Sequence, residues 1–74
     1  MNSKTNKAAK IGLRFEHPNN KIGTGVILQS CLYLPPIKED RRKGPWFGVH
    51  YDVSPYQWYH IDDITKLLVE SRVE

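Results

Sequence analysis

The chain has 74 residues, of which 39% are hydrophobic, and its formal net charge is +3. This length allows one small domain with a marginal core, which closure of a sheet or self-association would help to stabilise. The lone Cys31 excludes a disulfide within the chain, and no apolar run after the first lysines is long enough for a signal peptide or a membrane span, so we expect a cytoplasmic protein.

The first residues, 1–9, are polar, small or charged and carry too little apolar surface to pack. We expect them to form a flexible arm in front of a domain that spans residues 10–74. The cations of the arm are Lys4 and Lys7, and Lys10 follows at its boundary.

Two strands are predicted in the first half of the domain. Residues 11–16 alternate apolar and polar side chains, which is typical of a strand with one buried face. A turn at residues 17–21 and two glycines then lead to residues 26–33, which are mostly apolar or small. We expect this stretch to form a long, bent strand, because Gly23 and Gly25 suit the corners of a closed sheet.

A charged loop is predicted after Pro35 and Pro36, which end the second strand because proline cannot donate to a ladder. Its four cations outnumber its two anions, and a solubilising surface and a phosphate contact both fit this pattern. Acidic residues gather elsewhere, so an anionic partner would approach from the loop and the arm. The loop cations are Lys38, Arg41, Arg42 and Lys43, and the acidic group is Asp52, Asp62, Asp63, Glu70 and Glu74.

An aromatic hairpin is the strongest signal in the chain. Residues 46–52 alternate between two faces, a Ser-Pro turn follows, and residues 57–61 form the second strand. Phe47, Val49 and Tyr51 share the face expected to point into the core. The residues expected to fill the interior of the closed sheet include Phe15, Val26, Leu28, Phe47, Val49 and Ile61.

The C-terminal segment allows two interpretations. Asp62 and Asp63 would cap a single helical turn with Ile64 and Leu67 facing inward, and residues 66–69 would form a last short strand. A C-terminal helix is the competing interpretation. The first of these completes the order of elements found in an all-β, five-stranded SH3-like (Tudor-like) barrel, which is the fold that we predict.

Several motifs resemble a known family. Residues 11–17, then Gly25-Val26-Ile27 and Pro45-Trp46-Phe47-Gly48-Val49, are similar to the heat-shock protein Q family, also called YccV-like or hemimethylated-DNA-binding. The resemblance spans residues 10–64 and implies a cytosolic SH3-like barrel linked to DNA binding or to the delivery of substrates to a protease. Phe47 and Gly48 replace the usual Tyr-His pair of that family.

Two further resemblances are shorter. The first half of the domain is similar to the Tudor-like tail of bacterial DNA helicases. Residues 57–59, Gln-Trp-Tyr, resemble the active-site Gln-Ile-Tyr of the type II dihydrofolate reductases, which are tetramers that use a nicotinamide cofactor. Trp58 in place of isoleucine departs from that pattern. The residues that carry the helicase likeness are Gly12, Arg14, His17, Gly23, Gly25 and Val26.

No catalytic or metal site is expected. His50 and His60 would face each other across the hairpin, but two ligands do not form a zinc site, and no other cofactor is indicated. Cys31 is expected to be a small buried side chain and not a nucleophile. The neighbours Asp62 and Asp63 point in different directions, so they do not form an acid and base pair.

The aromatic residues exceed what so small a core can bury, so some of them are expected at the surface. We expect a non-enzymatic module that binds duplex DNA, with phosphates bound by Lys4, Lys7, Lys10, Lys38, Arg41, Arg42 and Lys43. A protein-binding adaptor and a homodimer that buries the aromatic surface are the alternatives, followed by the reductase. The aromatic interaction surface is predicted at Trp46, Tyr56, Trp58 and Tyr59.

Overall fold

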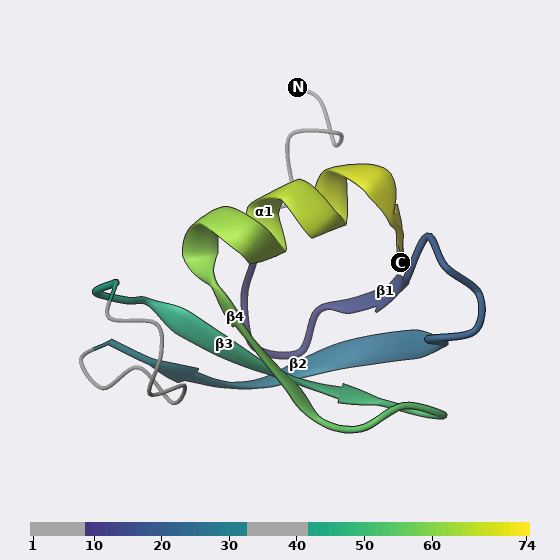
Figure 1. The fold of residues 1–74 in the computed structure, drawn as a ribbon, viewed down its shortest axis with the longest axis horizontal. Coiled ribbons are helices and arrows are strands. Elements are labelled where there is room, and N and C mark those ends of the chain that lie inside the picture. The colour runs from purple at the N-terminus through teal and green to yellow at the C-terminus, as the bar shows by residue number, and fades with distance from the viewer. Residues whose placement is uncertain (1–8, 33–41) are drawn as a thin grey trace.

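The computed structural model of this protein describes residues 9–32 and 42–74, which form five strands and one helix. The strands make one antiparallel sheet in the order β4-β3-β2-β1-β5, and the helix runs between β4 and β5 across one face of the sheet (Figure 1). The elements are β1 Arg14–Glu16, β2 Thr24–Cys31, β3 Trp46–Tyr51, β4 Gln57–His60, α1 Ile61–Glu70 and β5 Arg72–Val73.

The five antiparallel strands confirm the predicted β-rich class. Strands β4 and β5 form the two edges of the sheet and do not pair with each other, so the sheet is not closed and a barrel is not confirmed. No helix among the described residues is long and apolar enough to cross a membrane.

Strand β1 is shorter than the alternating pattern predicts. It begins at Arg14, because Gly12 has a φ of 95° and belongs to a turn in which the Leu13 N–H donates to the Lys10 carbonyl. Glycine adopts this left-handed conformation without a steric penalty. Ile11, expected on the buried face, is therefore 61% exposed.

Two of the core positions expected in strand β2, Val26 and Leu28, are wrong, and the strand contains a bulge at the second of them. The pairing with β3 shifts between Ile27 and Gln29, so Leu28 is the extra residue and is 49% exposed. Ile27 faces Val49 and is fully buried, whereas Val26 is only half-buried on the opposite face. The predicted continuation of this strand to residue 33 stops at Cys31, and Tyr33 lies outside the described residues.

The C-terminal segment is a helix, so the predicted strand at residues 66–69 is wrong and the competing interpretation is right. Ile64 and Leu68 stand one helical turn apart and are fully buried against the sheet. His60, and not an aspartate, is the N-cap: its Nδ1 accepts a hydrogen bond from the Asp62 N–H. Both aspartates lie in the first turn, where carboxylates are favoured by the helix dipole.

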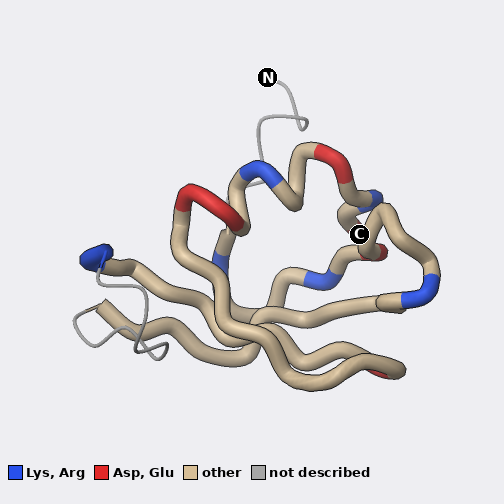
Figure 2. Tube along the Cα trace, viewed as in Figure 1, with Lys and Arg blue, Asp and Glu red and all other residues tan. Residues whose placement is uncertain are grey.

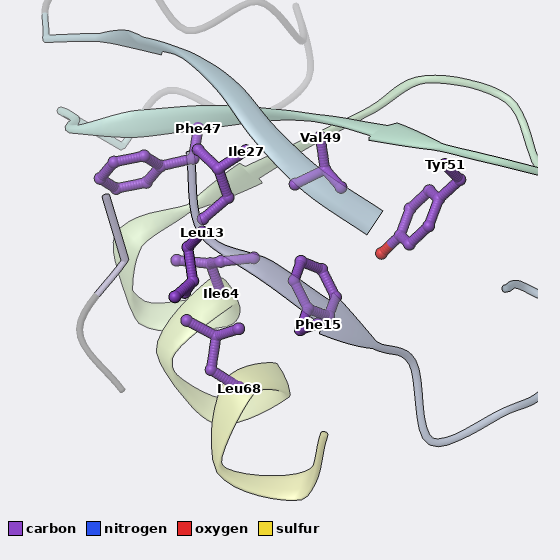
Figure 3. Close-up of a cluster of buried hydrophobic side chains, with 8 residues drawn as sticks. All are labelled: Leu13, Phe15, Ile27, Phe47, Val49, Tyr51, Ile64 and Leu68. Atoms are coloured by element: carbon purple, nitrogen blue, oxygen red, sulfur yellow. The ribbon is translucent and has the colours of Figure 1, made fainter. Parts of the chain in front are cut away.

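The core lies between α1 and the inner face of the sheet (Figure 3). The three β3 side chains predicted to point inward do so, as does Ile64 of the helix, whereas Leu68 is buried in place of the expected Leu67, which is only half-buried. Ile61, expected in the core, is half-buried at the edge of this cluster. The buried cluster is Leu13, Phe15, Ile27, Phe47, Val49, Tyr51, Ile64 and Leu68.

Candidate interaction surface

The cations predicted to bind nucleic acid are divided between described and undescribed parts of the chain. Lys10, Arg42 and Lys43 are described and exposed. Figure 2 shows the Lys and Arg residues of the described segments spread around the molecule, with acidic residues between them, and not gathered on one face. The other predicted contacts, Lys4, Lys7, Lys38 and Arg41, lie outside the described residues.

Arg42 is engaged within the fold. Its Nη2 lies 2.8 Å from Oδ2 of Asp63, and its guanidinium carbon is 5.7 Å from the centre of the Trp46 ring. The expectation that the acidic residues lie away from the charged loop is therefore wrong at Asp63. The reason is that the first turn of α1 starts beside the end of this loop.

Trp46 is 1% exposed, so it is not part of an accessible aromatic surface. Its Nε1 donates to the Arg42 carbonyl at 3.0 Å, and its ring meets the His60 ring edge to face at 5.1 Å. Trp46 and His60 lie opposite each other on β3 and β4, and they hold the returning chain at Arg42 and Lys43. We call Trp46 and His60 the loop anchor.

The contacts of His60 define its tautomer and engage both of its ring nitrogens. Because Nδ1 accepts from the Asp62 N–H at 3.2 Å, Nε2 carries the proton and donates to the Lys43 carbonyl at 2.7 Å. His50 lies opposite Val26 and does not face His60, which corrects the predicted pairing of the two histidines. No cluster of three metal-binding side chains occurs within residues 9–32 and 42–74.

Tyr59 faces the core and not the outer surface predicted for it. Its hydroxyl and that of Tyr51 are 2.7 Å apart and share a hydrogen bond. Burial raises the pKa of Tyr51, and the bond to Tyr59 raises it further. This pair therefore closes one end of the core.

Tyr56 and Trp58 remain on the outer face, opposite α1, and we call them the aromatic pair. Their ring centres are 5.7 Å apart with an interplanar angle of 70°. Gln29 donates its side-chain N–H to the Tyr56 hydroxyl at 2.8 Å, and the Tyr56 ring lies directly over Gly48, where a Cβ atom would collide with it. Two neighbouring strands therefore fix the position of Tyr56.

Trp58 offers an unused donor. Register with Gly48 places its side chain on the outer face, and both aromatic side chains of the pair are half-buried. The indole N–H of Trp58 has no hydrogen-bond partner among the described residues, in contrast to that of Trp46. A partner that covers this surface would satisfy it.

A shallow cavity of about 290 Å³ continues the outer face towards the other end of β2. Its charged groups are engaged: Asp52 Oδ1 accepts from the Thr24 N–H at 2.9 Å, and Arg14 Nε lies 3.4 Å from Glu74 Oε1. Its lining is Arg14, Thr24, Gly25, Val26, His50 and Asp52.

Sequence reasoning missed Gln29 and Gly48, which position the aromatic pair. Gly48 stands alone among bulky strand residues, and a glycine at such a position signals close approach of another group. Gln29 left no comparable signal, because its contact with Tyr56 depends on the bulge in β2.

Three comparisons were made with known proteins, namely with family models, with curated proteins and with solved structures. No family model, no curated protein and no solved structure matches this chain.

Proposed function

We propose that this chain is a non-enzymatic, SH3-like binding module that docks a protein partner on the aromatic pair. The observation that carries the proposal is the arrangement of Tyr56 and Trp58 on the outer face of the sheet, where the indole N–H of Trp58 has no partner within residues 9–32 and 42–74. Aromatic side chains held in place in this way dominate the binding energy of protein interfaces.

The SH3-like class is supported by the strand order and by the position of α1 just before the short last strand. The likeness to the heat-shock protein Q family remains part of the proposal. At the position where that family carries a histidine, this chain has Gly48, and the Tyr56 ring occupies the space above it. A partner of this surface would therefore meet tyrosine and tryptophan instead of the family's histidine.

The charges favour a protein over a phosphate backbone at this surface. Lys and Arg nearly balance Asp and Glu among the described residues, and the two described arginines nearest to the outer face and to the charged loop, Arg14 and Arg42, each have a carboxylate partner. Phosphate binding needs several unpaired cations along one surface.

Selection of peptides from a displayed random library on the full chain tests the proposal. We expect selected peptides whose affinity falls at least about tenfold on Trp58→Ala, as for an interface anchor worth more than 1 kcal/mol. Val53→Ala is the matched control, because Val53 is 68% exposed and apolar but lies in the turn that precedes β4. Peptides that bind the Trp58→Ala variant as tightly as the unchanged chain would contradict the proposal.

Duplex DNA binding is the second candidate, and exposed Lys43 at the end of the basic loop favours it. Fluorescence anisotropy with unmethylated and hemimethylated duplexes across a salt series tests it. DNA binding through the loop predicts affinity that falls steeply with salt and that weakens in Lys43→Ala. Lys66→Ala on α1 is the control, and equal losses in both variants would indicate non-specific attraction only.

A further inference from the structure

Strand β4 is an exposed sheet edge without the usual protection. Both edges, β4 and β5, lack a partner strand among the described residues. Strand β5 has only two residues, and the charged residues Arg72 and Glu74 lie in it or next to it. Strand β4, Gln57–His60, contains no charge and no proline, which are the features that normally keep edges from pairing with other chains.

The backbone of β4 directs some of its hydrogen-bonding groups away from the sheet. The Ile61 N–H donates to the Pro45 carbonyl, and hydrogen-bonded and non-hydrogen-bonded pairs alternate along an antiparallel ladder. The backbone N–H and carbonyl groups of Gln57 and Tyr59 therefore point towards β3, and those of Trp58 and His60 point towards the open edge. The carbonyl of His60, the N-cap, accepts the first hydrogen bond of the helix. Trp58 is therefore the β4 residue whose N–H and carbonyl are both directed to the open edge.

We propose that two copies of this chain pair through β4, antiparallel and about a two-fold axis, with Trp58 opposite Trp58 of the second copy. In this register the two Trp58 residues exchange both of their backbone hydrogen bonds. The two sheets become one continuous sheet, and both aromatic pairs lie on the same outer face.

A second copy fits this edge better than an unrelated strand because the edge is self-complementary. Antiparallel pairing of β4 with itself brings no like charges together, since Tyr56 and the four residues of β4 carry no net charge when His60 is neutral. It also sets two large aromatic side chains side by side. A chain of 74 residues buries a modest fraction of its surface, so association adds to its stability.

This inference does not rest on the proposed docking of a protein partner. Edge pairing joins the two sheets side by side and leaves the outer face open, so the dimer would present two aromatic pairs to a partner. Failure of peptide binding and failure of dimer formation are therefore separate results.

Sedimentation velocity over a concentration series tests the dimer in the unchanged chain. We expect an equilibrium between monomer and dimer whose dissociation constant rises about tenfold on Trp58→Lys. The substitution removes the contact between the Trp58 side chains of the two copies and sets two like charges opposite each other. Val53→Lys adds the same charge away from the edge and is expected to leave the constant unchanged. Circular dichroism checks that both variants remain folded.

Cysteine crosslinking tests the register independently. In a Cys31→Ser background, Trp58→Cys is expected to form a disulfide-linked dimer on oxidation, because directly opposed residues of a hydrogen-bonded pair have Cα atoms about 5.5 Å apart. Gln57→Cys is the control, since residue 57 lies opposite residue 59 of the second copy and is out of reach of its own counterpart.

Three outcomes would overturn the proposal. One is a monomer at every concentration, and another is equal crosslinking of the Trp58→Cys and Gln57→Cys variants. The third is a monomer whose β4 edge binds a selected extended peptide, which would assign the edge to a foreign strand.

Discussion

Gly48 determines where the aromatic pair lies, because the missing side chain leaves room for the Tyr56 ring. Gly48 has no side chain, and Tyr56 uses the space above it to reach Gln29 and to stand beside Trp58. A glycine inside a strand weakens that strand, so its position here is explained by the aromatic ring that it accommodates. The position of the aromatic pair thus depends on a residue that has no side chain.

Gly48→Ala is expected to destabilise the fold by about 1–3 kcal/mol, because the new methyl group displaces the Tyr56 ring. Urea unfolding followed by fluorescence measures this loss. In a Tyr56→Ala background the same substitution should cost much less, since the ring is already absent. Equal losses of stability in the two backgrounds would show that the Tyr56 ring is not what excludes a side chain at residue 48.

Tyr51 gives the stability a dependence on high pH. Burial raises the pKa of its hydroxyl in the folded chain, whereas an unfolded tyrosine ionises near pH 10, at about its ordinary value. The unfolded state therefore loses the proton first, so the contribution of neutral Tyr51 is complete below about pH 10 and is lost as the pH rises above it.

We expect the urea midpoint of the unchanged chain to fall between about pH 9 and pH 11, and to fall less in Tyr51→Phe, which has no hydroxyl to ionise. Tyr56→Phe is the control, because the Tyr56 hydroxyl lies on the outer face and bonds to Gln29. A midpoint that falls equally in Tyr51→Phe and in the control would contradict this account.

At the scale of the elements, the loop anchor joins three segments that are distant in sequence. Trp46 of β3 and His60 of β4 hold the chain at Arg42 and Lys43, and His60 also caps α1. Asp63 of the helix completes the arrangement through its ion pair with Arg42. One histidine thus ties the end of the charged loop to the start of the helix.

Two substitutions at His60 separate its role as the N-cap of α1 from its hydrogen bond to the Lys43 carbonyl. His60→Ala is expected to cost about 1–3 kcal/mol, since it removes a buried side chain, the helix cap and the bond to Lys43. His60→Asn should cost less, because asparagine is a good N-cap but is too short to reach the Lys43 carbonyl. Chemical denaturation measures both losses, and equal losses would indicate that the cap contributes nothing.

The sequence predicts the parts of the fold that follow from local patterns. Alternation over residues 46–52 predicts β3 and its inward side chains, because strand periodicity is a local property. The burial of Trp46 was not predictable, since it depends on the return of Arg42 over its ring. Likewise, the bulge at Leu28 depends on pairing with β3, and no pattern within β2 reveals it.

The C-terminal segment shows how two local signals compete. Ile61, Ile64 and Leu68 have helical spacing, but the segment is also short and β-branched enough to resemble a strand. Packing of Ile64 and Leu68 on the inner face of the sheet decides in favour of the helix. Of the predicted aromatic surface, Trp46 is buried and Tyr59 faces the core, whereas Tyr56 and Trp58 lie half-buried on the outer face, because the orientation of each ring depends on strand register.

At the scale of the whole molecule, one face of the sheet is covered and the other is available. Helix α1 packs on the inner face, whereas no described element packs against the outer face around the aromatic pair (Figure 1). Cations are distributed around the described surface and are not concentrated (Figure 2). This arrangement supports a binding module whose recognition surface is aromatic.

A titration of the ¹⁵N-labelled chain with a selected peptide, followed through its two tryptophan indole N–H signals, tests this claim most directly. The buried Trp46 indole donates to the Arg42 carbonyl and serves as an internal control, whereas the Trp58 indole is unpaired among the described residues. We predict that the Trp58 signal shifts on binding while the Trp46 signal stays in place. A Trp58 signal that does not move when the peptide binds would contradict the proposal that the aromatic pair is the recognition surface.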